Sequence, residues 1–301
     1  GKTAHFVGSG LASLAGATFL IRDAQLPGDK ITIYEELGLP GGSMDGILDE
    51  HKGFIIRGGR EMEAHFETLW DLFKSIPSLS VEDASVLDEM YWIHKINPSS
   101  NPARAIHDKG AKIDHLTDLT LTRGAAEELM KLVLTREEDL QDKRIDEVFG
   151  KEFFESHFWL YWATMFAFEP WASALEMRRY TLRFIHHIST LSDLTSLRFT
   201  RYNQYESLIK PLVAYLEGHG VKFVYNTQVD NIDLDSTGSS KQAKRIHLTE
   251  NGESKTVDLT ENDLVFVTNG SITESSTYGD NDTPAAVVTD NGGAWSPVSY
   301  T

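Results

Sequence analysis

A short glycine turn near the start of the chain constrains the fold more than any other feature. Residues 2–7 form a β-type run that ends at Gly8, and a helical apolar period follows over residues 11–22. In the pattern Gly8-x-Gly10-x-x-Ser13, the first glycine makes a tight turn and the second lets the backbone approach a pyrophosphate. Ser13 replaces the glycine or alanine that is usual at the third position. This strand, turn and helix predict a dinucleotide-binding unit.

A second strand completes a βαβ unit and ends in an acidic residue. The β-branched run over residues 30–35 ends at Glu35, where a carboxylate can accept hydrogen bonds from ribose hydroxyls. A fully buried strand is expected at residues 263–268, after a largely antiparallel stretch between residues 221 and 259. This late return to a parallel sheet favours FAD over NAD as the dinucleotide. The antiparallel runs would be a structural meander in either case.

The middle of the chain predicts an inserted and mostly helical region. We expect an α/β fold, a Rossmann-like FAD-binding domain of the glutathione-reductase type, formed by residues 1–75 and 200–301. Residues 76–199 would be a substrate-binding insertion, with a strand at residues 90–96 and a helix at residues 172–188. The aromatic segment 159–168 would either pack as a core, which is favoured, or line an apolar tunnel. The tail, residues 271–301, is expected to be irregular.

Composition and charge exclude several classes of function. The chain has 28 Lys and Arg against 45 Asp and Glu, a formal net charge of -17, which argues against a nucleic-acid partner. No apolar run reaches the roughly 20 residues that a membrane span needs. The absence of cysteine excludes disulfides and thiolate chemistry. Because the first residues read as a strand and not as a leader, a cytoplasmic location is expected.

Two further clusters contain candidate chemistry. In the segment 57–62, two glycines would let a ligand approach the backbone, and Glu61 is expected in the first turn of a helix. From the residues alone, complementing the helix dipole is the favoured role of Glu61. Tyr180 could donate a proton from an expected helix, although most such tyrosines are packing residues. Adjacent His186 and His187 would point about 100° apart on a helix, so no metal site is predicted.

Several long segments of the sequence resemble one bacterial family. They are residues 8–15, 39–46, 57–62, 165–173, 177–180 and 202–207, for example Arg-Gly-Gly-Arg-Glu-Met at 57–62. On these segments the chain is identified as a member of the fatty acid hydratases, the oleate hydratases that were first called myosin-cross-reactive antigens. The resemblance runs from about residue 3 to residue 278. Family members are longer at both ends, so the chain is interpreted as truncated at both ends.

The resemblance implies a hydro-lyase that adds water across a cis double bond of a free unsaturated fatty acid, oleate or linoleate, without net redox change. It implies that Glu61 activates water, that Tyr180 protonates the alkene and contacts the substrate, and that Gln204 helps to hold the fatty acid carboxylate. FAD would be a scaffold for the loop that contains Glu61. The expected FAD-binding residues are Gly8, Gly10, Ser13, Glu35, Gly42, Ser43, Arg57, Gly58, Gly59, Glu61, Met62, Val229, Asn269, Gly270 and Ser271.

The resemblance also implies a homodimer and, in full-length members, a peripheral membrane contact. Two alternatives to hydration stay open. One is a redox flavoprotein or a double-bond isomerase that acts on fatty acids. The other is an inactive fragment that binds FAD or lipid.

Overall fold

The chain folds into two compact units that are interleaved along the sequence. The computed structural model describes residues 1–102, 106–107, 109–112, 118–238, 240–268, 277 and 279–288. Unit 1 comprises Gly1–Glu61, His65–Lys95 and Phe199–Thr301, and unit 2 comprises Met62–Ala64 and Ile96–Arg198. Residues 76–95, which were expected in the insertion, therefore pack within unit 1. Within this segment Ile76 and Val86 are both buried, and the Val86 amide donates to the Ile76 carbonyl.

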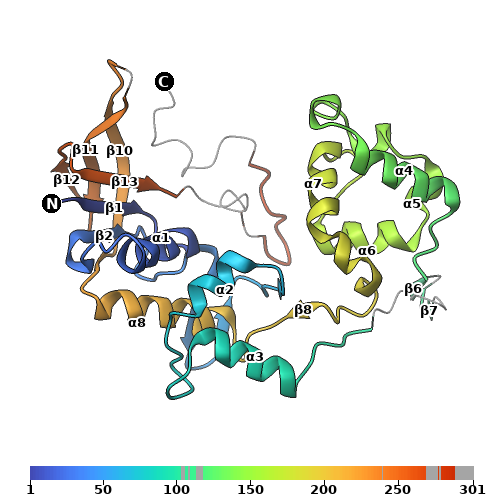
Figure 1. Ribbon diagram of the computed structural model, residues 1–301, viewed down its shortest axis with the longest axis horizontal. Coiled ribbons are helices and arrows are strands. Elements are labelled where there is room, and N and C mark those ends of the chain that lie inside the picture. Colours follow the sequence, from blue (N-terminus) through green and yellow to red (C-terminus); the bar gives the residue numbers. More distant parts are fainter. Residues whose placement is uncertain are drawn as a thin grey trace. The chain divides into compact units, whose positions relative to one another are not determined.

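A four-stranded parallel sheet forms the centre of unit 1 (Figure 1). Its order is β13 (Asp263–Val267), β1 (Thr3–Val7), β2 (Ile31–Tyr34) and β9 (Lys222–Val224). Phe6 on β1 lies in register with Phe266 on one side and Ile33 on the other. Helix α1 (Leu11–Arg22) connects β1 to β2, so the expected βαβ unit and the late parallel strand are both confirmed. The expectation that this strand is fully buried is wrong, because the first three residues of β13 are half-buried and Phe266 and Val267 are exposed.

The two faces of this sheet are covered by different kinds of element. Alternate residues of each strand point to opposite faces. One face of β1 contains Phe6, which approaches Gly16 of α1, and α1 also packs against α8 (Lys210–Gly218). The other face contains Tyr34 and packs on a three-stranded antiparallel sheet of β10 (Thr227–Asp235), β11 (Gln242–Glu250) and β12 (Glu253–Asp258). Unit 1 is therefore layered as helices, parallel sheet and antiparallel sheet.

The other described elements of unit 1 are short. They are η1 (Gly28–Lys30), η2 (Gly42–Met44), β3 (Gly46–Asp49), β4 (Gly53–Ile56), α2 (Glu67–Phe73), α3 (Val86–Ile96) and the π-helical turn η6 (Tyr205–Ile209). The strand expected at residues 90–96 is wrong, because these residues belong to α3. Ser85 and Asp88 exchange hydrogen bonds at the start of α3, as in a capping box, and this pair outweighs the β-forming residues Tyr91 and Trp92.

Unit 2 is mostly helical. Its elements are β5 (Met62–Glu63), β6 (Ile106–His107), β7 (Ala111–Lys112), α4 (Arg123–Leu134), η3 (Glu137–Asp139), η4 (Ile145–Glu147), α5 (Lys151–Phe154), α6 (His157–Phe166), α7 (Ala174–Phe184), η5 (Ile185–Thr190) and β8 (Leu197–Arg198). Hydroxyl side chains fix where the main helices begin. Thr122, Ser156 and Ser173 accept hydrogen bonds from first-turn amides of α4, α6 and α7. The helix expected at residues 172–188 is α7, which passes into η5.

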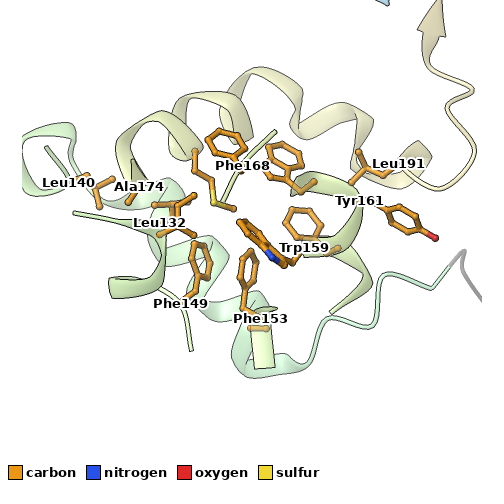
Figure 2. Close-up of a cluster of buried hydrophobic side chains, with 14 residues drawn as sticks. Leu132, Leu140, Phe149, Phe153, Trp159, Tyr161, Phe168, Ala174 and Leu191 are labelled. Carbon is orange, nitrogen blue, oxygen red and sulfur yellow. The ribbon is translucent and has the colours of Figure 1, made fainter. Parts of the chain in front are cut away.

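The aromatic segment of α6 forms the core of unit 2 (Figure 2). Phe149, Phe153 and Trp159 point into a common apolar interior, while the Tyr161 hydroxyl points away from it. Trp162 is fully buried and stacks on Phe158 at 5.3 Å between ring centroids. Complete burial of each such side chain contributes about 1.5–3 kcal/mol. This packing supports the core interpretation of segment 159–168 over an apolar tunnel.

No described helix is suited to cross a bilayer. The longest, α1 and α4, have 12 residues each, whereas a span needs about 20. None of the helices in the described part of the chain combines the required length with the required apolarity.

Candidate functional site

The glycine turn leaves the N-terminus of α1 open to an anion. Gly10 is the N-cap residue of α1, and in the described part of the chain no side chain caps this helix and no acidic residue lies in its first turn. The first amides of a helix have no partner within the helix, and its dipole favours negative charge there. The turn itself is fixed, because the Gly8 amide donates to the Tyr34 carbonyl at 2.8 Å. This arrangement suits a phosphate or diphosphate group.

Glu35 lies at the end of β2 and braces the same turn. Its buried carboxylate accepts hydrogen bonds from the Ser9 amide at 3.0 Å and the Leu37 amide at 2.9 Å, and also from the Ser9 hydroxyl. A carboxylate has about four lone-pair positions, so it can accept a further hydroxyl donor. Ser9 was missed as a functional residue, although it lies between the two glycines of the motif.

Ser13 has a specific structural reason to replace glycine or alanine. It is fully buried, and its hydroxyl lies 3.0 Å from the Thr268 hydroxyl, which itself donates to the Val7 carbonyl. The close approach of helix and strand instead occurs at Gly16, where an added Cβ would lie 2.9 Å from the Phe6 ring. The departure at Ser13 therefore links α1 to the end of the returning strand.

A second glycine loop lies beside the first. A Cβ added to Gly42 would lie 2.9 Å from the Gly10 Cα, so only glycine fits this contact. Arg57 binds the buried Asp45 with two hydrogen bonds, of 2.7 and 3.0 Å, and Arg60 donates to the Ser43 carbonyl. These contacts bring the expected residues Gly42, Ser43 and Arg57 together with the glycine turn. Asp45 was not predicted.

Gln204 fixes the glycine pair at residues 58–59. Its side chain is buried, and its amide nitrogen donates to the Gly58 carbonyl at 2.6 Å. Gln204 directly precedes the π-helical turn η6, a distortion that occurs often at functional sites. A Cβ added to Gly59 would meet no heavy atom within 4 Å, which leaves room beside the loop.

Four expected site residues or segments are placed differently from the rest. Val229 is buried in the core between the two sheets. Met62 is buried and belongs to unit 2. Asn269, Gly270 and Ser271 lie outside the described residues.

Glu61 is exposed and is not on a helix. The adjacent residues 62–63 pair as β5 with β8, and the next helix begins only at Glu67. The expected dipole role of Glu61 is therefore wrong.

Tyr180 lies in unit 2 among aromatic rings. Its ring meets Phe166 and Phe168 edge to face, at 5.3 and 5.2 Å between centroids, and Phe184 follows one turn later on α7. The phenol is partly buried. An apolar chain could contact such a surface while the hydroxyl remains able to donate a proton.

A charged cluster surrounds Glu63, two residues after Glu61. Glu63 is 2% exposed, and its carboxylate binds Arg183 at 2.6 Å, His187 at 2.9 Å and His186 at 3.4 Å. The expectation that the two histidines diverge is wrong, since both rings approach one carboxylate oxygen. The possible ligand atoms of Glu63, His186 and His187 lie within 4.8 Å of one another. Because Arg183 already compensates the carboxylate, we interpret the cluster as an ion-pair network.

Comparison with known proteins identifies the family. The MCRA family model matches residues 1–297. The chain belongs to the MCRA family. This MCRA chain is 53% identical over 98% of its length to oleate hydratase of Streptococcus pyogenes serotype M49 (strain NZ131), of which it covers 50%. It is 32% identical over 94% of its length to linoleate hydratase of Lactiplantibacillus plantarum, of which it covers 53%. The MCRA chain thus spans about half the length of the curated relatives it matches.

Solved structures share the fold of the MCRA chain. The CLA-producing fatty acid isomerase from P. acnes matches with a TM-score of 0.52 and 14% identity, over 89% of this chain and 58% of that one. Putrescine oxidase bound to putrescine matches with a TM-score of 0.53 and 13% identity, over 89% and 57%. Such low identities show the fold alone. They confirm the expected class, an α/β Rossmann-like fold, and the structure itself shows the mostly helical second region.

Proposed function

We propose that the MCRA chain contains the FAD-binding and catalytic residues of a fatty acid hydratase. Its reaction would add water across a cis double bond of a free unsaturated fatty acid such as oleate or linoleate. The observation that carries this proposal is the 53% identity to oleate hydratase over nearly the whole chain. The open helix N-terminus and the two adjoining glycine loops support it.

The residues of unit 1 fit a bound FAD. The α1 amides and Gly10 would hold the diphosphate, Glu35 would accept from a ribose hydroxyl, and the loop at Gly42 and Gly58 would lie along the ligand. When bound, FAD would supply a rigid flat surface and not electrons, because hydration leaves the oxidation state of the substrate unchanged overall. Backbone contacts are the proposed role of Val229, whose side chain is buried.

The proposed chemistry needs one acid and one base. The Tyr180 hydroxyl gives its proton to one alkene carbon, and positive charge develops on the other. A water oxygen bonds to that second carbon and releases a proton to the Glu61 carboxylate, which also stabilises the developing charge. Proton transfer from Glu61 back to the Tyr180 oxygen through solvent restores both groups. The sum is one water added and no electrons transferred.

The surroundings of the two residues support these roles. Phe166 and Phe168 give Tyr180 an apolar environment in which an alkene can lie against the phenol. Glu61 is exposed and so accessible to water. Gln204 uses its side-chain nitrogen on the Gly58 carbonyl, and an amide NH2 has a second hydrogen to donate to the fatty acid carboxylate.

The test is product analysis by mass spectrometry in ¹⁸O-labelled water. The 301-residue chain and a chain extended to the length of its relatives are each incubated with oleate or linoleate and FAD. We expect ¹⁸O in a hydroxy fatty acid, and a loss of about 100-fold or more in Glu61→Gln and Tyr180→Phe. Exposed Glu50→Gln and Tyr91→Phe are the matched controls, expected to keep normal rates. Normal turnover in both test variants would reject the roles. Oxygen consumption or an isomerised product without ¹⁸O would reject hydration.

A further inference from the structure

Glu63 is a buried charge of unit 2 that the proposed reaction does not use. Its side chain is 2% exposed, and a carboxylate removed from water needs charged or hydrogen-bonding partners. Arg183 binds one of its oxygens and the two histidines approach the other. All four residues belong to unit 2, although Glu63 is 120 positions before Arg183 in the sequence.

Two residues of the cluster lie close in sequence to the proposed catalytic residues. Glu63 follows Glu61 by two residues, so their Cα atoms are at most about 7 Å apart. Arg183 follows Tyr180 by three residues on α7, and residues three apart are neighbours on a helix surface. The ion pair between Glu63 and Arg183 therefore connects the segment next to the proposed base with the helix that contains the proposed acid.

Backbone pairing reinforces this connection. Met62 and Glu63 form β5, which pairs antiparallel with Arg198 and Leu197 of β8. This strand is only two residues long, and so short a pairing contributes few hydrogen bonds by itself. The side chain of Glu63 supplies charge-assisted bonds that neutral ladder bonds cannot match in strength.

We infer that Glu63, held by Arg183, His186 and His187, is a positioning residue that fixes the segment 62–64, which directly follows Glu61 in the chain, to helix α7 and η5. This inference rests on the proposed roles of Glu61 and Tyr180 and deepens them. Misplacement of a reacting group by about 1 Å can slow a reaction about 100-fold. Loss of the cluster should accordingly lower kcat and leave FAD binding and the KM for oleate nearly unchanged.

The experiment uses Glu63→Gln, Arg183→Gln and the double variant in the chain extended to the length of its relatives, with FAD and oleate. We expect kcat to fall about 10- to 100-fold in each single variant, with KM within about twofold. The double variant should be no slower than the slower single variant, because both remove one interaction. Arg183→Lys, which keeps the charge, should restore part of kcat and guards against a folding defect.

Arg179→Gln is the matched control. Arg179 lies on the same helix next to Tyr180 and forms an exposed ion pair of 2.5 Å, but with Glu137 and not with the segment at residues 62–64. It should keep normal kcat. Hydrogen exchange of the backbone amides at residues 61–64 should accelerate in Glu63→Gln and not in the control.

The outcomes separate this inference from the proposed function. Normal kcat in Glu63→Gln, an equal fall of kcat in Arg179→Gln, or acceleration of exchange throughout unit 2 would each overturn the positioning role. Absence of a hydroxy product with the unaltered extended chain would instead overturn the proposed function, and the positioning role with it.

Discussion

Ser9 lies between the two glycines of the turn and Ser13 occupies the third position of the motif, and each hydroxyl bonds to a residue at or just beyond the end of another strand. Ser9 bonds to Glu35 at the end of β2, and Ser13 meets Thr268 just after β13. A glycine turn must stay in one conformation for its amides to converge on an anion, and these buried bonds restrict it. The small side chains of Ser9 and Ser13 are thus part of the site's rigidity.

His5 on β1 predicts a specific acid sensitivity of the fold. Burial lowers the pKa of His5 below its ordinary 6.5, and the attraction of Asp263 only partly opposes this. The unfolded chain therefore takes up the proton first as the pH falls through about 6.5. His5 then contributes stability above that pH and loses it on acidification. We expect the free energy of unfolding to fall between pH 7.5 and 5.5, and to fall less in His5→Gln, as measured by urea denaturation.

Other groups that face His5 act in different pH ranges. Burial, and next the charge of Glu250, raise the pKa of Tyr34 to about 12. Burial opposes ionisation of Asp263, but hydrogen bonds from Thr3 and Thr260 hold the pKa of Asp263 below 3.8. Neither Tyr34 nor Asp263 therefore changes its charge between pH 7.5 and 5.5. An identical slope in His5→Gln and in the unaltered chain would contradict the prediction.

At the scale of elements, the contact between α1 and β1 predicts an unfavourable Gly16→Ala substitution. Alanine gains about 1 kcal/mol over glycine in a helix. At Gly16, however, the new Cβ would lie 2.9 Å from the ring of Phe6, which is 1% exposed and stacked on Phe266. Overpacking of this kind costs about 1–3 kcal/mol, so we expect a net loss of stability of up to about 2 kcal/mol.

Chemical denaturation measures the effect of Gly16→Ala. Exposed Ala12 on the same helix supplies the control, because Ala12→Gly should lose about 1 kcal/mol through propensity alone. A more stable Gly16→Ala variant would show that the ring of Phe6 can move aside and that the helix is not closely fitted to the sheet.

Local sequence patterns predicted the elements whose determining residues lie close together in the chain. The glycine turn, α1, β2 and the return of β13 to the sheet were readable because each has its own period and end signal. The helix predicted at Glu61 failed because β8, more than 130 residues later, captures residues 62–63 as a strand. The hydrogen bond from Gln204 to Gly58 and the cluster at Glu63 could not be predicted either, because their partners are more than 100 residues apart in the sequence. Such partners are set by the tertiary fold.

For the molecule as a whole, the hairpin of β3 and β4 presents an exposed apolar patch. Ile47, Leu48, Phe54 and Ile55 are 49%, 65%, 61% and 39% exposed. Leu48 pairs with Phe54 across the hairpin and shares one face with it, while Ile47 and Ile55 share the other face. Exposed apolar surface of this kind promotes association. We expect the combined Leu48→Ser and Phe54→Ser substitutions to reduce aggregation of the 301-residue chain without a change in its unfolding midpoint.

Light scattering during heating and dye binding measure this effect. Leu134→Ser is the control, since Leu134 is 75% exposed but lies at the end of α4 in unit 2, whereas the hairpin belongs to unit 1. An equal improvement in Leu134→Ser would mean that total surface hydrophobicity, and not this patch, drives association. Sedimentation of the same variants also tests the expected homodimer, which stays a prediction.

The interleaving of the two units has a consequence for synthesis on the ribosome. The polypeptide passes between the units after Glu61, Ala64, Lys95 and Arg198. Unit 2 has all its residues once Arg198 has emerged, whereas the parallel sheet of unit 1 must wait for β13 to join β1. Unit 2 can therefore fold first. Its strand β5 is synthesised more than 30 residues before the other residues of the unit. The nascent glycine turn meanwhile lacks the neighbouring strand that completes it.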